Sequence, residues 1–138
     1  MNDHTTAFKV LENYGNLVIR TVPMPSDCNH GGTIFGGWIL SQIDIGASLA
    51  AIHYSSGRVV TKAVEKVTFI KPIHVHNQVD IYAKLSKVGN TSVTFDVYVF
   101  VSSRTSINEL AVTANIVFVR IDDNHKPIGI SKLKKESN

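Results

Sequence analysis

The sequence predicts an α+β protein in which one long helix packs against an antiparallel sheet. Two patterns support this class. Apolar residues recur at helical spacing along residues 33–54, a span of roughly 30 Å, and they alternate with polar residues in several later segments. Short connections join those later segments, which favours antiparallel pairing. One helix against such a sheet forms a layered α+β domain.

The part of the chain before the helix is predicted to hold a strand and a loop. We expect residues 1–14 to be poorly ordered or weakly attached, and an apolar stretch at 16–23 to form a strand. Residues 24–32 are rich in proline, aspartate, asparagine and glycine, which are typical of turns. Thr33 can cap the helix start, and Gly57 can follow its end.

After Gly57 the apolar period changes from helical to alternating. Four segments are predicted to be strands: 58–70, 78–87, 91–103 and 110–121. Pro72 ends the first of them, Gly89-Asn90 forms a hairpin turn, and residues 122–126 close the last. The 138 residues therefore form one domain, with an ordered core at about 15–130.

Composition excludes several classes of protein. The chain has no run of about 18 apolar residues and no signal-peptide pattern, so we expect no membrane span and a cytoplasmic location. Its single Cys28 fits a reducing compartment and provides neither a disulfide framework nor a zinc-ligand set. None of the six histidines has a metal-binding spacing, and no metal is expected.

The net charge of +3 does not indicate a nucleic-acid-binding protein. Part of it comes from Lys132, Lys134 and Lys135, which we interpret as a solvated chain end. The other charges are dispersed rather than gathered in a basic stripe with aromatic residues, so nucleic acid is not an expected partner. A modest positive surplus favours anionic ligands, including phosphates.

The predicted helix is apolar on all sides. A helix of this kind should be buried on all sides, and a single curved sheet cannot surround it. We therefore expect a second copy of the chain to cover the rest, so that helices lie near a subunit interface.

Asp44 is the only formally charged residue between Asn29 and Gly57, and it lies midway along this helix. One interpretation is structural: a buried carboxylate paired with an arginine or with backbone N–H groups. The other is functional, because burial in a cleft can tune the pKa of a catalytic carboxylate.

Two glycine pairs lie at the start of the helix, in the segment NHGGTIFGGW at residues 29–38. Glycine lets a ligand approach the backbone closely, and the N–H groups of a first helical turn are unpaired. Such groups can hold a developing oxyanion, although Gly36-Gly37 can equally serve close packing. His30 is a candidate base without an obvious nucleophile beside it. Glu65 can line the same cavity, but an ion pair is the favoured interpretation for it.

These residues carry a family resemblance. The segment at 29–39 followed by QID at 42–44 resembles the YciA-type acyl-CoA thioesterases, in the wider group of the brain-type acyl-CoA hydrolases. Three further stretches agree in order: GRVVT at 57–61, VTFIKPI at 67–73 and GNTS at 89–92. The similarity covers about residues 15–130, and the loop at residues 30–32 is where relatives vary.

The resemblance implies a hotdog fold, in which a long helix is wrapped by a curved antiparallel sheet, and dimers that assemble as a trimer of dimers. It implies an active site between two subunits, with Asp44 as the helix carboxylate and Asn29 as the loop asparagine. The acyl carbonyl meets backbone amides around the glycines Gly31, Gly32, Gly36 and Gly37. Contacts with coenzyme A map to Arg58, Lys71, Gly89, Thr91 and Ser92.

The implied reaction is hydrolysis of a fatty acyl-CoA to the free acid and CoA. Asp44 acts as general base or as nucleophile, Asn29 orients the water or the carbonyl, and no cofactor is needed beyond the CoA of the substrate. A hotdog dehydratase or hydratase is an alternative, with His30 as its candidate histidine. A non-catalytic acyl-CoA sensor is another, although a pure binder gains little from a buried acid.

Helix geometry separates the two halves of this site within one chain. Gly37 and Asp44 are roughly 10 Å apart along a helix. One thioester carbon cannot lie within hydrogen-bond reach of both ends of that span. Two antiparallel helices across a two-fold axis solve the problem, since the start of one then lies beside the middle of the other. We therefore expect Asn29 of one chain to serve Asp44 of its partner.

Overall fold

The computed structural model describes residues 11–130. Its elements are the short 3-10 helices η1 (Glu12–Tyr14) and η2 (Pro25–Asp27), the strand β1 (Asn16–Thr21), the helix α2 (Gly36–Ser55) and the strands β2 (Val59–Phe69), β3 (Gln78–Val88), β4 (Ser92–Ser102) and β5 (Glu109–Arg120). The predicted order of a strand, a long helix and four strands is confirmed, as is the hairpin turn between β3 and β4.

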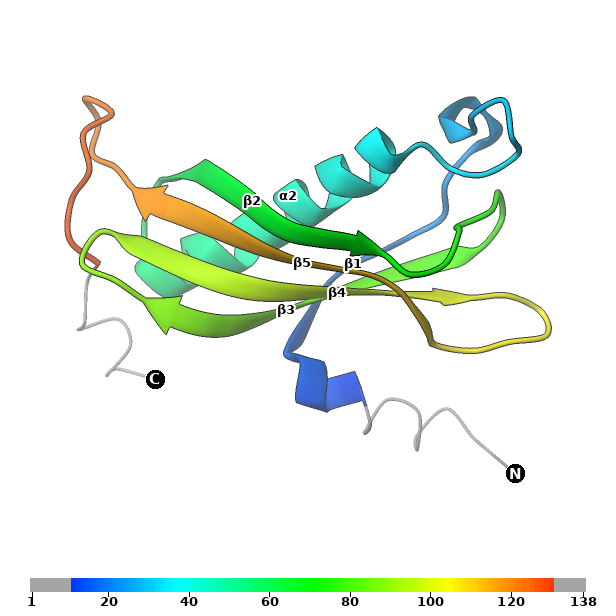
Figure 1. Ribbon diagram of the computed structural model, residues 1–138. Helices are drawn as coiled ribbons and strands as arrows, with labels where there is room; N and C mark the ends of the chain where they lie inside the picture. The colour runs from blue at the N-terminus through cyan, green and yellow to red at the C-terminus, as the bar shows by residue number, and fades with distance from the viewer. Residues whose placement is uncertain (1–10, 131–138) are drawn as a thin grey trace.

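The five strands form one antiparallel sheet in the order β1-β3-β4-β5-β2. The helix α2 lies across one face of this curved sheet (Figure 1). The strands β1 and β2 are the two edges. The arrangement is the hotdog fold.

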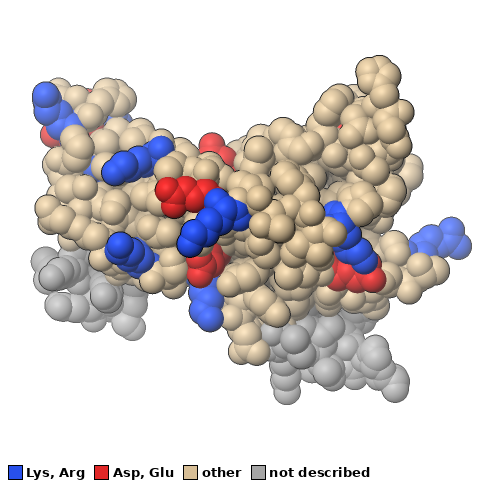
Figure 2. All heavy atoms as spheres, viewed as in Figure 1, with Lys and Arg blue, Asp and Glu red and all other residues tan. Residues whose placement is uncertain are grey.

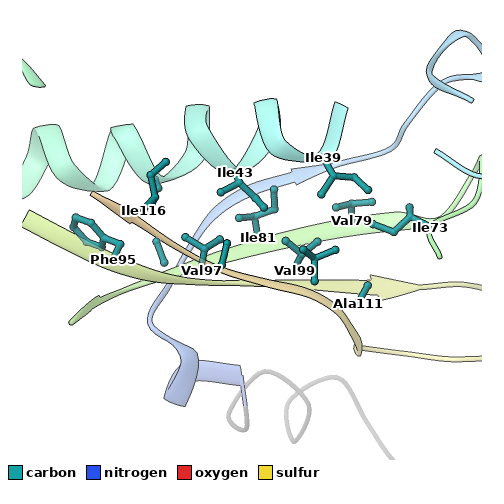
Figure 3. Close-up of a cluster of buried hydrophobic side chains, with 14 of the residues drawn as sticks. Ile39, Ile43, Ile73, Val79, Ile81, Phe95, Val97, Val99, Ala111 and Ile116 are labelled. Carbon is teal, nitrogen blue, oxygen red and sulfur yellow. The ribbon is translucent and has the colours of Figure 1, made fainter. Parts of the chain in front are cut away.

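The core lies between α2 and the sheet. The helix contributes Ile39, Ile43, Ala47 and Ala51, spaced four residues apart and all buried. They meet alternate residues of β3, β4 and β5, and Figure 3 shows Ile39 and Ile43 pointing down at these strands. The alternation of apolar and polar residues in the sequence thus indicates which face of each strand packs against the helix.

Gly46 brings α2 close to β1. A Cβ atom at Gly46 would lie 2.8 Å from Val18 Cγ2 and 3.2 Å from Ile19 Cδ1. Because no side chain fits there, the helix can rest directly on the β1 edge of the sheet. Gly46 therefore fixes which side of the helix faces β1.

The helix begins later than predicted. Residues 33–35 lie before the helix: Ile34 N–H donates to Ile73 O, and Ile34 forms an isolated β-bridge with Cys28. Thr33 is not the cap, because the N-cap position belongs to Phe35, which makes no side-chain cap bond. At the other end Ser56 adopts a left-handed conformation, and Gly57 follows the helix as expected.

Residues 11–14 correct the prediction of a weakly attached N-terminal stretch. Leu11 is buried against Tyr82 and Phe100, and the ring of Tyr14 packs edge-on against Tyr98 at 4.8 Å between centroids. This cluster covers the sheet face opposite α2 (Figure 1). The expectations for residues 1–10 and for the lysines at 132–135 fall outside the described residues.

Over residues 11–130, no helix is long and apolar enough to cross a membrane. On the face drawn in Figure 2, basic and acidic side chains are interspersed rather than gathered in a basic stripe.

Candidate active site

Asp44 lies on the side of α2 that faces β2. Its carboxylate is half-buried, and Asp44 Oδ1 accepts a 2.6 Å hydrogen bond from Thr61 Oγ1 on β2. Thr61 is the one side chain within residues 11–130 that donates a hydrogen bond to this carboxylate. The bond fixes the direction in which Asp44 points and leaves acceptor capacity on the carboxylate for a water molecule or a substrate.

Asp80 shows what a structural carboxylate looks like in the same chain. It is 1 % exposed, and Arg20 donates to both of its oxygens, from Nε at 2.8 Å and from Nη2 at 3.0 Å. Hydrogen bonding to Asp80 raises the pKa of Arg20. Among the ion pairs of the described chain none involves Asp44. Within residues 11–130 the arginine-paired arrangement therefore occurs at Asp80 and not at Asp44.

Asn29 organises the loop before α2. Its Oδ1 accepts hydrogen bonds from Gly31 N–H at 2.9 Å and Thr33 N–H at 3.2 Å, while its Nδ2 donates to Thr33 Oγ1 at 3.1 Å. Asn29 N–H also donates to Thr33 O at 2.7 Å. The asparagine therefore closes a tight turn that presents the helix start.

The four glycines divide into two pairs. The N–H groups of Gly31 and Gly32 donate to Asn29, so both are used inside the loop. The N–H groups of Gly36 and Gly37 have no acceptor within the described residues, as expected for a first helical turn. Only the second pair is free to bind an oxyanion in this conformation.

A hollow of about 380 Å³ opens beside Gly36. Its walls are largely apolar: Ile34, Ile39, Phe69, Ile70 and Ile73 contribute to them, and Lys71 lies at its margin. The ring of Phe69 stands 3.3 Å from the position that a Cβ atom on Gly36 would take. An apolar group bound here would lie against the free amides.

The residues predicted to contact CoA fall at two ends of the molecule. Arg58 and the hairpin of Gly89, Thr91 and Ser92 lie together, because Ile121 N–H donates to Arg58 O and Arg120 N–H to Thr91 O. Arg58 also approaches Asp123 at 3.6 Å. Lys71 lies at the opposite end, beside the start of α2, where it donates to Glu109 at 2.8 Å.

The residues predicted for the site do not all lie together within one chain. Asp44 is eight residues along the helix from Gly36, or about 12 Å. Asn29 and the free amides therefore lie at one end of α2, and Asp44 lies near its middle.

The structure adds to what the sequence predicted for two residues of β2, Glu65 and Thr61. Glu65 is exposed and pairs with Asn115, whose neighbours Ala114 and Ile116 face the helix, so Glu65 lies on the sheet face away from Asp44. It makes no ion pair within residues 11–130. Its place on that face argues against a role in lining a cavity with Asp44, and the ion-pair interpretation stays a prediction. The sequence did not identify Thr61 as a partner of Asp44. The clue available was its hydroxyl group, in the GRVVT stretch of a strand that was predicted to pack beside the helix.

Other candidate groups stay apart from this site. His30 is exposed in the loop. In the described part of the chain, no three histidine, cysteine, aspartate or glutamate residues are gathered in a way that could hold a metal ion.

Comparison with known proteins places the chain among thioesterases. The Thioesterase superfamily profile matches residues 31–107. The acyl-CoA thioester hydrolase YciA of Salmonella typhimurium is 42 % identical over 82 % of this chain and 88 % of its own. An uncharacterized acyl-CoA thioester hydrolase of Haemophilus influenzae is 46 % identical over 80 % of this chain and 74 % of its own.

Solved structures of thioesterases also resemble this chain. The Asp-to-Ala variant of HI0827, described as a hexameric broad-specificity acyl-coenzyme A thioesterase, matches with a TM-score of 0.83 at 41 % identity, covering 89 % of this chain and 94 % of that chain. An acyl-CoA hydrolase of Staphylococcus aureus in complex with butyryl coenzyme A matches with a TM-score of 0.77 at 27 % identity, covering 86 % and 76 %.

Proposed function

Because the chain belongs to the Thioesterase superfamily and is an acyl-CoA thioester hydrolase of the hotdog fold, we propose that Asp44 is the carboxylate that performs the hydrolysis. The observation that supports this role most strongly is the contrast with Asp80. Asp44 is a half-buried acid in an otherwise uncharged helix, and it is oriented by one hydroxyl group rather than neutralised by a cation.

In the proposed reaction, water or Asp44 itself attacks the thioester carbonyl carbon. As a general base, Asp44 takes a proton from the water while the oxygen–carbon bond forms. As a nucleophile, it forms an acyl anhydride that water then cleaves. In both routes the carbon–sulfur bond breaks, the CoA thiolate takes up a proton, and the acid is released.

The free N–H groups of Gly36 and Gly37 are the proposed oxyanion hole. They point out of the helix start, where the partial positive charge of the helix dipole adds to their effect. One hydrogen-bond donor in an oxyanion hole contributes about 3 kcal/mol in other hydrolases. The apolar hollow beside Gly36 gives the uncharged part of the thioester a place against these donors.

Asp44 and these amides meet across a dimer in the proposed enzyme. The edge strand β2 has eleven residues and exposes Val60, Val64 and Phe69, whereas the other edge strand β1 has six residues. A long apolar edge is a template for pairing with another chain. Antiparallel pairing of β2 with its copy about a two-fold axis extends the sheet and sets the two helices side by side.

The helix face toward β2 suits this pairing. Asp44 shares that face with Gly37, Ser41 and Ser48, at spacings of four, three and four residues. Ser41 and Ser48 donate their hydroxyl hydrogens to carbonyls of their own helix, at 3.1 Å and 2.7 Å. Small side chains that are satisfied internally let two helices approach closely, so the start of one reaches Asp44 of the other.

The same two-fold symmetry brings the residues predicted to bind CoA close together. The midpoint of β2 is Val64, so a two-fold axis near it sets Arg58, before the strand, opposite the partner subunit's Lys71, after it. One cationic and amide-rich margin for the CoA phosphates is then formed by Arg58, the hairpin at 89–92 and that lysine. We propose that three such dimers form a hexamer, in a cytoplasmic enzyme that needs no cofactor other than water and the CoA of its substrate.

Asn29 acts in this proposal through the loop it closes and through its remaining Nδ2 hydrogen. That hydrogen has no acceptor within the described residues and lies at the loop that precedes the free amides. It can therefore bind the substrate carbonyl or the attacking water when the partner's Asp44 is in place.

Replacing Asp44 with asparagine tests the proposed role directly. The substitution Asp44→Asn is nearly isosteric and leaves Thr61 a carbonyl acceptor, so the fold and the melting temperature should be kept. Turnover of acyl-CoA, followed by free thiol, should fall by at least about 100-fold, because general-base catalysis contributes roughly that much or more. A folded variant with wild-type kcat contradicts the assignment.

A further inference from the structure

A second hollow lies at the opposite end of α2 from Gly36. It has a volume of about 550 Å³ and is bounded by the C-terminal half of α2, by β1 and by β3. It shares no lining residue with the hollow beside Gly36, and it includes neither Asp44 nor any residue predicted to contact CoA. Small-molecule sites in proteins enclose about 300–1,000 Å³ and are mostly apolar with a few polar groups. The second hollow therefore has the size of a ligand site of its own.

Strand lengths and small residues leave this space unfilled. The strand β3 continues to Val88, but its pairing with β1 ends at Ala83, so β1 does not accompany the last part of β3. Gly15 turns the chain at that point with a φ of 98°, and a Cβ atom there would lie 2.2 Å from Ala83 O. No side chain at position 15 can therefore fill the space between α2 and β3. Ala50 and Ala83 add only methyl groups to the lining.

Leucine side chains from three elements surround the second hollow. Leu17 of β1, Leu49 of α2 and Leu85 of β3 all line it and are 43 %, 47 % and 37 % exposed. Phe95, which belongs to the core, completes the apolar lining. Single exposed leucines are ordinary on a protein surface, but several around one concavity mark a binding site. Their exposure indicates an aliphatic ligand.

The charged groups around the second hollow are all basic. Among the described residues that line it are Lys84 and His53, and none is an aspartate or a glutamate. Lys84 Nζ donates to Asn13 O at 3.1 Å, its one acceptor in the described chain. An ammonium group has three hydrogens, so two are left for a ligand. Charge complementarity therefore favours an anionic head group beside the aliphatic part.

We propose that the second hollow binds an aliphatic carboxylate, the chemical class of the acid that this thioesterase releases. The head group accepts hydrogen bonds from Lys84 at the margin, and the hydrocarbon chain lies against Leu17, Leu49 and Leu85. The inference uses the hydrolysis of acyl-CoA only for the identity of the acid. It is independent of the role proposed for Asp44, so the enzyme holds its product at a place apart from the catalytic groups.

The test measures binding of decanoate by isothermal titration calorimetry, with octanoate and decan-1-ol for comparison. Decanoate should bind about fifteenfold more tightly than octanoate, because each buried methylene group contributes roughly a factor of four. It should bind about threefold more tightly than decan-1-ol, the size expected of one exposed charge contact. Lys84→Gln should weaken decanoate binding by the same factor of about three. Ala50→Leu places a larger side chain in the hollow and should weaken it at least tenfold.

Matched controls separate this hollow from the rest of the chain. Lys87→Gln removes the same charge from the same strand outside the hollow, and Gly37→Ala alters the helix start. Both variants should keep the wild-type Kd for decanoate. Weaker binding in Gly37→Ala with an unchanged Kd in Ala50→Leu assigns the acid to the hollow beside Gly36 and overturns the inference. Equal affinity for decanoate and decan-1-ol, or an unchanged Kd in Lys84→Gln, overturns it as well.

Activity and melting temperature guard against a folding defect. Ala50→Leu and Lys84→Gln should hydrolyse acyl-CoA at the wild-type rate, and decanoate should raise the melting temperature of wild-type protein more than that of either variant. Equal stabilisation of wild type and both variants contradicts the proposed site. Asp44→Asn should keep the wild-type Kd for decanoate whatever its turnover, so failure of the proposed catalytic role and failure of this inference are different results.

Discussion

Thr61 is the residue on which the orientation of Asp44 depends. Sequence patterns identified Asp44, because a lone acid in an apolar helix stands out in one dimension. They could not identify Thr61, since its bond to Asp44 crosses 17 residues and depends on how the helix lies against β2. In the same way, the role of Asn29 in closing its own loop is a matter of backbone geometry rather than of residue type.

We predict that Thr61→Val lowers kcat about tenfold and leaves KM nearly unchanged. The change keeps the side-chain shape but removes the hydrogen bond to a carboxylate, worth about 1.5–3 kcal/mol. Thr61→Ser should restore most of the rate. Thr68→Val is the matched control on the same strand, since Thr68 makes no bond to Asp44. Equal kcat in the Thr61→Val and Thr68→Val variants shows that Thr61 does not position the carboxylate.

Glu109 is predicted to compete with CoA for Lys71. Hydrogen bonds from Lys71 and then Ser106 lower the pKa of Glu109, so the carboxylate is charged at neutral pH and holds the lysine at 2.8 Å. Glu109→Gln should therefore lower KM for acyl-CoA at low salt, by no more than about fivefold because the pair is exposed. The effect should fade as salt screens the phosphates.

Glu65→Gln removes the same charge from the sheet face away from the site. It should leave KM unchanged at low salt, and this separates a local contact from a general change in net charge. If both glutamine variants shift KM equally, Lys71 is not the group that Glu109 restrains.

At the scale of elements, the strands were predicted to within two residues at either end, because each buries one face and alternation follows from that. The start of α2 was predicted three residues early. Ile34 and Phe35 continue the apolar pattern, but the bond from Ile34 N–H to Ile73 O holds this segment extended. Residues 11–14 were misjudged because their anchor is an aromatic cluster contributed by distant strands.

Two glycines of α2 are predicted to have different roles: Gly46 in stability and Gly37 in catalysis. Gly46→Ala forces a Cβ atom against Val18 and Ile19 and should cost about 1–3 kcal/mol of unfolding free energy. Gly37→Ala meets no atom within 4 Å in the chain and should preserve stability. It should nevertheless reduce kcat/KM, because its methyl group would stand where the thioester meets the free amides.

Thermal melts and steady-state kinetics of the two alanine variants check this division. A Gly37→Ala enzyme with wild-type kcat/KM shows that the substrate does not approach the helix start. A Gly46→Ala protein as stable as wild type shows that α2 can move away from β1 without loss.

At the scale of the whole molecule, the residues proposed for the site lie in two separate groups within one chain. The amides of Gly36 and Gly37 lie about 12 Å along α2 from Asp44. In the proposed dimer, a two-fold pairing through β2 brings the amides of one chain to Asp44 of the other. Helix length and the family resemblance both predicted this separation within one chain and a site shared between two chains, which stays a prediction. The sequence could not show which face of α2 lies toward β2 and which lies away from the sheet, because that depends on the positions of β1 and β2 around the helix.

The most direct test of the shared site is complementation between two inactive variants. Asn29→Ala disables the helix-start half, whether through direct contact or through its loop, and Asp44→Asn disables the other half. In a mixed dimer one site carries both lesions and the other carries neither. Equal co-refolding makes half of the dimers mixed, so activity should recover to about one quarter of wild type.

The matched control co-refolds Asp44→Asn with Thr61→Val. These two residues belong to the same half of the site, so no intact site forms and activity should not rise above the average of the two parents. The measurement is acyl-CoA hydrolysis by mixtures shown to contain mixed dimers. Recovery near one quarter with Asn29→Ala, and none with Thr61→Val, is the predicted result; a mixture of Asn29→Ala and Asp44→Asn that stays as inactive as its parents contradicts a site shared between chains.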